Sequence, residues 1–158
     1  CVYDVAHNTA KLEEHEVAGH RRELLVHRKG ATRAFPPGHP DLPLDYRETG
    51  QPVIVGGSLE TGSYLLAGVA TGSASFFSTA HGSGRTMSRT RARKLIRGDE
   101  LLRRLEARGI LVRAASLRGL AEEAGFAYKD VDDVAAATEL AGLSKRVVHL
   151  VPVGNVKG

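Results

Sequence analysis

The 158-residue sequence has little of several residue types: one cysteine, one methionine, no tryptophan and only 5% aromatic residues. A single cysteine cannot form an internal disulfide, so we expect a reducing, cytoplasmic compartment. No apolar run approaches the roughly 20 residues that a membrane-spanning helix needs, and no secretory signal is visible at the start. Hydrophobic residues make up 42% of the chain, which is enough to form the core of a domain of this length.

The chain does not begin with methionine, and its opening letters CVYDVAHN alternate as a strand inside a sheet does. We therefore expect a strand at residues 2–6 and interpret the chain as a fragment whose earlier part is missing. The simpler interpretation of Cys1 is a small buried or terminal residue, at a domain cut or at the start of an incomplete gene. The sharper alternative is the first residue after an intein, which needs a nucleophile at that position.

Hydrophobic patterning predicts one α+β domain with a mixed or antiparallel sheet, strands mainly in the first half and helices mainly in the second. The expected strands are residues 23–27, 53–55, 63–70, 75–80, 110–116 and part of 147–158. The expected helices are two within 86–110, divided at Gly98, then 116–125, begun by Ser116, and 130–142, closed by Gly142. Residues 33–50 contain four prolines, so we expect a long ordered loop there.

The net charge is +4, and arginine is concentrated between residues 85 and 113. The flat guanidinium group binds phosphate through two parallel hydrogen bonds, and a basic surface attracts polyanions such as nucleic acid. A solvated helix face has the same composition. Charge alone favours that simpler interpretation.

The stretch STAHGSGRTMSR places His81 in a glycine-rich loop between an expected strand and an expected helix. Gly82 and Gly84 allow a sharp turn whose N–H groups form an anion-binding nest, and a helix N-terminus adds to that positive field. Arg85 and Arg89 are four residues apart, so we expect both on one helical face, able to reach the same phosphate. A neutral imidazole beside a bound phosphate is a competent nucleophile. A plain turn explains the loop equally well.

Other polar clusters are weaker signals. VGGSLETGSY is a second glycine-rich turn after a strand, but it lacks the lysine and the spacing of a Walker motif. VHRKGATRAFPPG groups His27, Arg28, Lys29 and Arg33, which could bind phosphates or exposed backbone carbonyls. His7 ends an expected strand, where ligands often emerge, but the other histidines do not have the spacing of metal ligands.

Taken in order, six blocks of the chain resemble the RtcB-type RNA ligase family: YDVAHN, VHRKGATRAFPPG, QPVIVGGSLETGSYLLAG, FFSTAHGSGRTMSR, AYKDVDDV and VGNVKG. Six blocks in the same order are far more specific than one glycine loop. The resemblance identifies residues 1–158 as the C-terminal catalytic portion of an RtcB-like ligase domain, about a third of a full-length member, without its N-terminal portion.

The resemblance implies an enzyme that joins RNA 3′-phosphate or 2′,3′-cyclic-phosphate ends to 5′-hydroxyl ends, with GTP and Mn²⁺ as cofactors. By resemblance, His81 attacks the α-phosphorus of GTP and forms a covalent GMP-histidine intermediate. The GMP then passes to the RNA 3′-phosphate, and the 5′-hydroxyl attacks that activated end. Implied partners are RNA ends from tRNA halves or broken RNA, the missing N-terminal portion, and an archease-type activator.

The same resemblance assigns residues to the site. It implies nucleotide contacts by His7, Asn8, Gly56, Gly57, Ser58, Leu59, Ser63, His81, Gly82, Ser83, Gly84, Tyr128 and Lys157. It implies contacts to phosphates of nucleotide or RNA by Lys29, Arg85 and Arg89. His7 matches a manganese ligand, and the family's other ligands, an aspartate, a cysteine and two histidines, would lie upstream of residue 1.

The chain departs from the family pattern at two positions. Ala80 stands where a cysteine usually precedes the active histidine, and Glu60 stands where a glycine or alanine is commoner. Two other functions remain open at this point: a non-catalytic basic RNA-binding module, or degenerate relative, and a nucleotide-binding protein that acts on another phosphate ester.

Overall fold

A computed structural model describes residues 3–158 and confirms the α+β class. The strands are β1 (Asn8–Val17), β2 (His20–Lys29), β3 (Ala31–Arg33), β4 (Pro52–Gly56), β5 (Ser63–Gly68), β6 (Ser78–Ala80), β7 (Leu111–Ala114), β8 (Ser144–Leu150) and β9 (Gly154–Lys157). The α-helices are α1 (Arg89–Leu95), α2 (Gly98–Ala107), α3 (Leu117–Ala121) and α4 (Val131–Leu140). Three short 3₁₀ helices are η1 (Leu44–Tyr46), η2 (Ala70–Ser75) and η3 (Gly125–Ala127). No helix among residues 3–158 has both the length and the apolar character that crossing a membrane requires.

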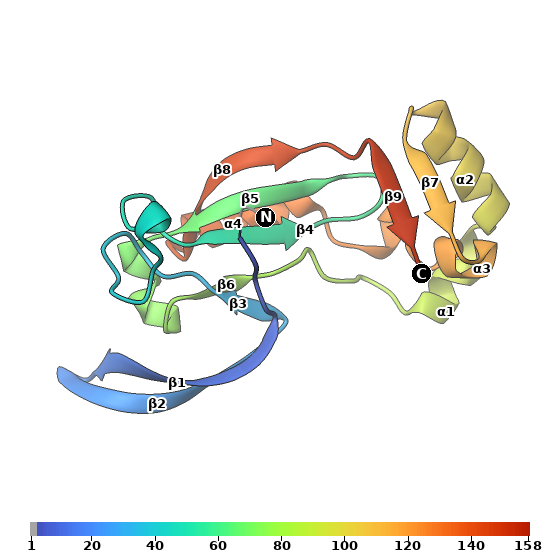
Figure 1. The fold of residues 1–158 in the computed structure, drawn as a ribbon. Coiled ribbons are helices and arrows are strands. Elements are labelled where there is room, and N and C mark those ends of the chain that lie inside the picture. The colour runs from blue at the N-terminus through green and yellow to red at the C-terminus, as the bar shows by residue number, and fades with distance from the viewer. Residues whose placement is uncertain (1–2) are drawn as a thin grey trace.

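The central sheet has the order β4-β5-β8, and all of its pairings are antiparallel. Side chains alternate along β4, so Val53 and Val55 are buried on one face while Ile54 is exposed on the other. Helix α4 packs on the buried face and contributes Val131 and Ala135 to this core. In Figure 1, α4 lies behind the sheet, and the sheet's opposite face carries no helix.

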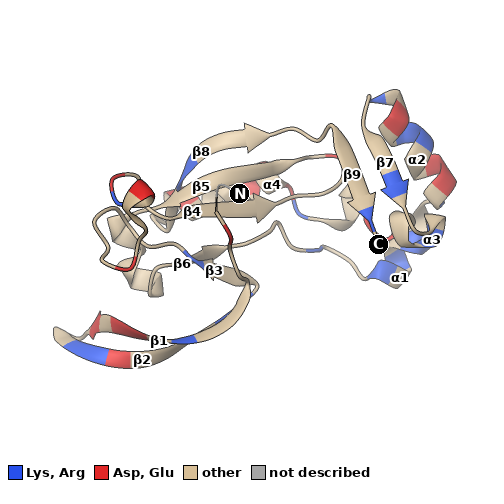
Figure 2. Ribbon diagram, viewed as in Figure 1, with Lys and Arg blue, Asp and Glu red and all other residues tan. Residues whose placement is uncertain are grey.

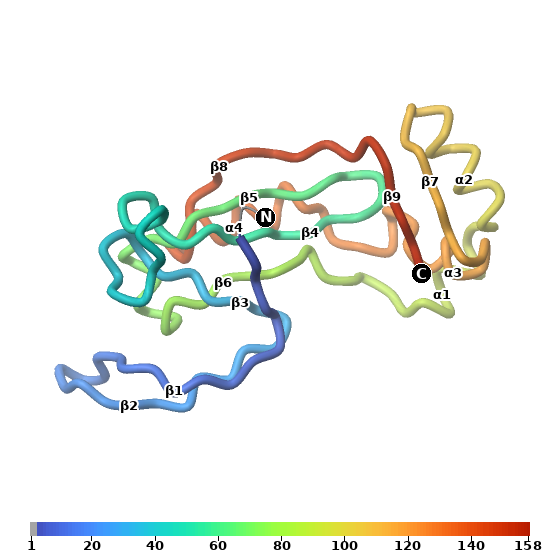
Figure 3. Tube along the Cα trace, in the orientation of Figure 1, coloured from blue at the N-terminus to red at the C-terminus, as the bar shows by residue number. Residues whose placement is uncertain are grey.

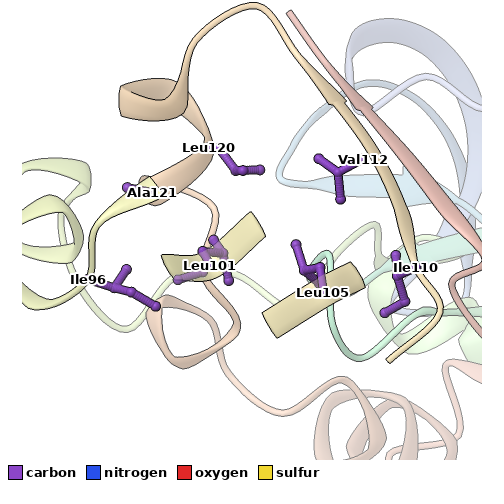
Figure 4. Packing of buried hydrophobic residues seen from close by; sticks show 8 residues of the cluster. Ile96, Leu101, Leu105, Ile110, Val112, Leu120 and Ala121 are labelled. Atoms are coloured by element: carbon purple, nitrogen blue, oxygen red, sulfur yellow. The ribbon is translucent and has the colours of Figure 1, made fainter. Parts of the chain in front are cut away.

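A second core lies at the other end of the molecule, where α2, α3 and the parallel pair β7–β9 come together (Figure 1). Figure 4 shows Leu101 and Leu105 of α2 directed toward Leu120 of α3 and Val112 of β7. Leu101, Leu105 and Leu120 are completely buried. Leu59, from the loop between β4 and β5, packs against this cluster and joins the two parts of the molecule.

Strands β1 and β2 form a long antiparallel hairpin that curves away from the rest of the chain (Figures 1 and 3). Arg28 donates to both carboxylate oxygens of Glu13, at 2.7 and 2.8 Å, and His15 Nε2 lies 3.0 Å from Oε2 of Glu13. Arg28 also donates to the carbonyl of Phe76 at 2.8 Å and to Oγ of Ser78 at 2.9 Å. This buried cluster ties the hairpin to the segment that leads into β6.

Most expected elements are present, but several expectations about the first half are wrong. Residues 3–6 are not a strand, and the first strand begins only at Asn8. Val2, the first residue of that expected strand, lies outside the described residues, and so does Cys1 with its alternatives. The expected strand at 75–80 is shortened to β6, because Phe76 and Phe77 adopt left-handed backbone angles, with φ of 52° and 50°. Bulky residues adopt this conformation only when the surrounding structure imposes it, and here the carbonyl of Phe76 is held by Arg28.

The helical half follows the expectations more closely. Ser116 and Asp130 accept hydrogen bonds from the first turns of α3 and α4, as N-caps do. Gly142 follows α4 with a φ of +66°, a left-handed conformation that ends helices. Gly98 separates α1 from α2, as expected, and is the first residue of α2. A Cβ at this position would lie 1.9 Å from the carbonyl oxygen of Leu117, so the backbone there has no room for a side chain. Helix α3 ends at Ala121, earlier than expected.

Candidate active site

The backbone of Gly56 joins the two glycine-rich loops. Its N–H donates to the carbonyl of His81 at 3.2 Å, and its carbonyl accepts from the N–H of Ser83 at 2.7 Å. These bonds form an isolated parallel bridge between Gly56 and Gly82. A Cβ on Gly82 would lie 3.3 Å from the carbonyl oxygen of Gly56, which is closer than Cβ atoms usually come to other heavy atoms. The close approach therefore depends on small residues, and it fixes the position of His81 relative to β4.

His81 lies against His7, the residue that precedes β1. The two imidazole rings are stacked, with centroids 4.5 Å apart and planes inclined by 19°. The carbonyl of His7 accepts from the N–H of Gly30 at 3.1 Å, and Thr32 Oγ1 donates to the carbonyl of Ala6 at 2.9 Å. The backbone on both sides of the His7 ring is thus held by the start of β3.

The two histidines line a small cavity of about 80 Å³ together with Val5, Thr32 and Ile54. Partial burial is the main cause that lowers the pKa of His81, and the neighbouring His7 lowers it further. An imidazole with a lowered pKa is mainly neutral at pH 7, which leaves one ring nitrogen with a free lone pair. His81 is therefore in the chemical state that a nucleophile requires.

The loop after His81 contains a buried hydroxyl group that lacks a partner. Ser83 is only 4% exposed, and within residues 3–158 its Oγ finds no hydrogen-bond partner. Buried hydroxyl groups are almost always satisfied, so such an oxygen indicates a site for a ligand or a water molecule. Gly84 follows with a φ of +74°, a conformation that favours glycine and turns the chain sharply.

The loop between β4 and β5 has an internal structure of its own. The N–H of Gly57 donates to the carbonyl of Gly62 at 2.9 Å, and Ser58 Oγ lies 3.0 Å from Thr61 Oγ1. Ser63 pairs with Gly56 at the end of the sheet. Of the residues assigned to this loop by resemblance, Ser58 and Ser63 are thus placed near the Gly56–Gly82 bridge, whereas Leu59 is directed into the second core.

Glu60 connects this loop to the helical half. Its carboxylate accepts from the N–H of Gly125 at 2.6 Å and from Arg104 Nη2 at 2.9 Å, and it lies 3.5 Å from Arg108 Nη1. Arg108 also donates to the Glu60 carbonyl at 3.0 Å. The residue that departs from the family pattern is therefore an ionic clasp between the loop and α2.

The expectation that Arg85 and Arg89 share one helical face is wrong. Helix α1 begins at Arg89, because Ser88 is its N-cap, and Arg85 lies before it in an isolated bridge with Tyr128. Both arginines approach the same pair of carboxylates, Glu122 and Glu123. Arg85 Nη1 lies 3.8 Å from Glu123. Arg89 Nε lies 3.5 Å from Glu122 and 4.0 Å from Glu123. A phosphate at this point would have to replace these carboxylates as the partner of both arginines.

Tyr128 belongs to the same cluster. Its hydroxyl accepts from Arg85 Nη1 at 2.8 Å and donates to Glu123, and the Arg85 guanidinium lies 4.7 Å from the ring centroid. Burial raises the pKa of Tyr128, and the bond to Glu123 raises it further. The segment is attached to the glycine loop by the N–H of Lys129, which donates to the Gly84 carbonyl at 2.9 Å.

The remaining assigned residues lie at the edges of this arrangement. Asn8 and Lys29 face each other across the base of the hairpin, and both are exposed. Lys157 lies in β9, opposite Ala114. Asn155, two residues earlier, donates from Nδ2 to the carbonyl of Leu59 at 3.1 Å, which attaches β9 to the loop between β4 and β5.

Sequence reasoning missed three groups that the fold brings to the site: Thr32, the carboxylate pair Glu122 and Glu123, and the clasp role of Glu60. All three act across more than 20 residues of sequence, which local patterns do not report. The only signal available for Glu60 was its departure from the family pattern.

The described residues do not by themselves fit a metal site. Among residues 3–158, no three histidine, cysteine, aspartate or glutamate side chains lie close enough together to hold a metal ion. His7 offers one nitrogen, beside His81, whereas manganese is typically held by an octahedral set of ligands.

A glycine-rich loop that carries a histidine, next to a second glycine-rich loop after a strand, is an arrangement that can bind phosphate. The sequence model of the family described as "tRNA-splicing ligase RtcB" matches residues 1–158. The chain therefore belongs to this family.

Relatives agree with this assignment. The chain is 52% identical over 157 residues to the tRNA-splicing ligase RtcB of Aeropyrum pernix and 57% identical over 159 residues to that of Thermococcus kodakarensis. It is also 52% identical over 157 residues to the RNA-splicing ligase RtcB of Mycobacterium bovis. Each match covers 99% of this chain but only 33%, 33% and 36% of the relative. The relatives are named as RNA ligases, and the chain spans about a third of their length.

We predict that Glu60→Ala loosens the loop without unfolding the protein. A hydrogen bond to a charged group contributes about 1.5–3 kcal/mol, so the amide of Gly125 should exchange with solvent roughly tenfold faster or more. Amide hydrogen exchange followed by NMR measures this directly. Glu106→Ala, on the exposed side of α2, is the matched control. Equal Gly125 protection in both variants would show that the clasp does not hold the loop.

We predict that Glu13 makes the hairpin anchor sensitive to acid. Burial alone would raise the pKa of Glu13, but the hydrogen bonds and charges of Arg28 and His15 outweigh burial and hold it below the ordinary value of 4.5. Its contribution to stability is therefore complete above about pH 4.5 and is lost as the pH falls through the lowered folded-state pKa.

Urea unfolding between about pH 7 and pH 2 tests this prediction. Glu13→Gln should reduce the free energy of unfolding by roughly 3–5 kcal/mol at neutral pH, because it leaves Arg28 buried without its counter-charge. The variant's stability should also depend less on pH than the wild type's below pH 4.5. Glu14→Gln, on the exposed edge of the hairpin, should keep the wild-type pH dependence. An unchanged slope in Glu13→Gln would contradict the assignment.

Proposed function

We propose that the chain is the catalytic C-terminal portion of a GTP-dependent RNA ligase that joins RNA 3′-phosphate or 2′,3′-cyclic-phosphate ends to 5′-hydroxyl ends. Family membership supports the ligase activity. The observation that carries the proposed mechanism is the stacking of His81 on His7 at a cavity beside the two joined glycine loops.

His81 is the proposed nucleophile. Its free ring nitrogen attacks the α-phosphorus of GTP, so that a P–N bond forms while the bond to pyrophosphate breaks. A 2′,3′-cyclic phosphate is first opened by water to a 3′-phosphate, as its bond to the 2′ oxygen breaks. The GMP is then transferred to an oxygen of the RNA 3′-phosphate, and the P–N bond breaks. The RNA 5′-hydroxyl finally attacks the activated phosphorus, a phosphodiester forms, and GMP leaves.

The chain's own residues position these groups. Phosphoryl transfer depends mainly on orientation and on stabilising charge on the phosphate oxygens. The N–H groups of Gly82 and Gly84 and the unpartnered Ser83 hydroxyl are proposed to hold phosphate oxygens, and the loop from Gly56 to Ser63 to hold the nucleoside. Tyr128 and Lys157 are proposed as guanylate contacts.

Manganese and GTP are proposed as cofactors of the complete protein. His7 would supply one manganese ligand, and the remaining ligands would come from outside this chain, since residues 3–158 contain no cluster of three potential ligands. A bound manganese ion would stabilise negative charge on phosphate oxygens.

The exposed face of the central sheet supports a second proposal, that this chain works together with the portion of its relatives that it lacks. A row formed by Ile54, Leu65 and Val148 crosses all three strands on this face. Ile54 and Val148 are 44% and 43% exposed. A cavity of about 340 Å³, lined mainly by apolar side chains, lies over the same face. We propose that the missing portion covers this face, as apolar surface of this kind usually contacts another protein part.

RNA ends are the proposed substrates, and an archease-type protein is a proposed activator. The principal alternative is a basic RNA-binding module without chemistry. Most arginines between residues 85 and 113 are paired with carboxylates of Glu60, Asp99, Glu122 and Glu123. These four carboxylates offset only part of the positive charge, and Figure 2 shows many basic positions in α1 and α2. The ion pairs do hold most of these arginines against the protein, which favours the enzyme over the alternative.

We predict that His81→Ala abolishes covalent labelling by radioactive GTP. The test uses this chain joined to the upstream two thirds of the Thermococcus kodakarensis relative, because the chain spans only a third of that protein. His20→Ala, at the exposed end of the hairpin, should be labelled like the wild type. Retained labelling in His81→Ala would mean that another residue is the nucleophile. Ligation assays with RNA and DNA ends separate the proposed function from action on another phosphate ester.

We also predict that the 158-residue chain alone binds Mn²⁺ weakly and does not join RNA ends. The reason is that His7 is not part of a three-ligand cluster within residues 3–158. Calorimetric titration with manganese chloride and a ligation assay measure the two properties, with the joined protein as the comparison. Full guanylylation of the chain alone would contradict the prediction.

A further inference from the structure

A second cavity adjoins the one at His81. It has a volume of about 220 Å³ and is lined by residues from three segments: Tyr3, Asp4, Val5, Ala6, Thr9, Lys11, Arg28, Thr32, Arg33 and Gln51. Val5 and Thr32 also line the cavity of His7 and His81. The two cavities are therefore adjacent, with Val5 and Thr32 bordering both.

The second cavity has an excess of positive charge. Arg28 is neutralised by Glu13, with which it shares two hydrogen bonds. The side chain of Lys11, by contrast, has no ion pair or hydrogen bond within residues 3–158. Arg33 donates to Oε1 of Gln51 at 3.2 Å, but no carboxylate among the described residues pairs with it.

One acidic residue, Asp4, also lines this cavity. Arg33 lies over the ring of Phe35, with 4.3 Å between its guanidinium carbon and the ring centroid. A guanidinium held by an amide and an aromatic ring keeps its charge and still has N–H groups to donate. Two cations without carboxylate partners in one cavity form a site for an anion with more than one charge, or for successive phosphates.

We propose that this cavity binds the phosphodiester backbone of the RNA strand whose 3′ end lies at His81, with Lys11 and Arg33 as the phosphate contacts. The proposal rests on the proposed function, because it identifies where the RNA substrate of the same site lies. The cavity volume of about 220 Å³ gives room for a sugar–phosphate unit. Thr9 and Thr32 also line this cavity.

The phosphates of GTP are the other possible source of this ligand chemistry, and two separate measurements distinguish them. The first is binding of a fluorescently labelled single-stranded RNA with a 3′-phosphate to the 158-residue chain, without GTP or manganese, by anisotropy. The second is covalent labelling by GTP in the joined protein, without RNA. If the cavity binds RNA, a substitution in it changes RNA binding only. If the cavity binds the nucleotide, the substitution changes covalent labelling by GTP.

Lys11→Glu should weaken RNA binding at least about fivefold near 0.1 M salt and reduce the salt dependence, because each lost contact on single strands lowers the slope by about 0.7. Arg33→Gln should also weaken binding, and Asp4→Asn should strengthen it, since it removes the only carboxylate among the cavity's described lining residues. All three variants should be labelled by GTP at the wild-type rate. Lys94→Glu, exposed on α1, is the matched control and should bind RNA as the wild type does.

The outcomes separate this proposal from the proposed function. Unchanged RNA binding in Lys11→Glu, or weaker binding in Asp4→Asn, would overturn the cavity as an RNA site, whatever His81 does. Loss of GTP labelling in Lys11→Glu would assign the cavity to the nucleotide instead. Weaker binding in Lys94→Glu than in Lys11→Glu would place the RNA on the arginine-rich helices. RNA binding that depends on Lys11 in a protein that GTP never labels would support the cavity and contradict the ligase mechanism.

Discussion

The arrangement of the site depends on one close backbone contact, in which Gly56 bonds to both sides of Gly82. Without a side chain at position 82, the loop that carries His81 can lie directly on the end of β4. This contact places the imidazole against His7 and beside the loop that follows Gly56. A side chain at Gly82 would press on the Gly56 carbonyl oxygen, 3.3 Å from its Cβ, and would push the loop that carries His81 away from the end of β4.

Longer-range anchors keep this contact in place. The buried Glu13–Arg28 pair holds the Phe76 carbonyl just before β6, and Thr79 in β6 is bonded to Ser144 of β8 at 3.0 Å. On the other side, Glu60 ties the loop after Gly56 to α2 and to η3. None of these anchors contacts His81 or His7 directly. Their shared effect is to limit how far His81 can move.

Much of this could be predicted from the sequence because it is encoded locally. Alternation along β4, the capping residue Ser116 and the glycine after α4 report on neighbours a few residues away. The loop around His81 was recognised for the same reason, since its glycines and its histidine are adjacent in sequence. The family resemblance then supplied the residues that local patterns do not connect, such as His7 and Tyr128.

The errors arose where distant segments decide the conformation. The left-handed Phe76 and Phe77 interrupt a pattern typical of a strand, because a hydrogen bond from Arg28 holds the turn. Arg85 and Arg89 were predicted to share one helical face, but Arg85 lies outside α1 in a bridge with Tyr128, and Ser88 caps the helix just before Arg89. Glu123 lies beside Arg85 and Glu122 beside Arg89, and the contact of both arginines with phosphate stays a prediction.

The most direct test of the central claim is a crystal structure of the joined protein with a GTP analogue whose α-phosphate cannot be transferred. The account predicts a ring nitrogen of His81 about 3–3.5 Å from the α-phosphorus and in line with the bond to pyrophosphate. An α-phosphate located outside the cavity of His7 and His81, or closer to another nucleophile, would contradict it.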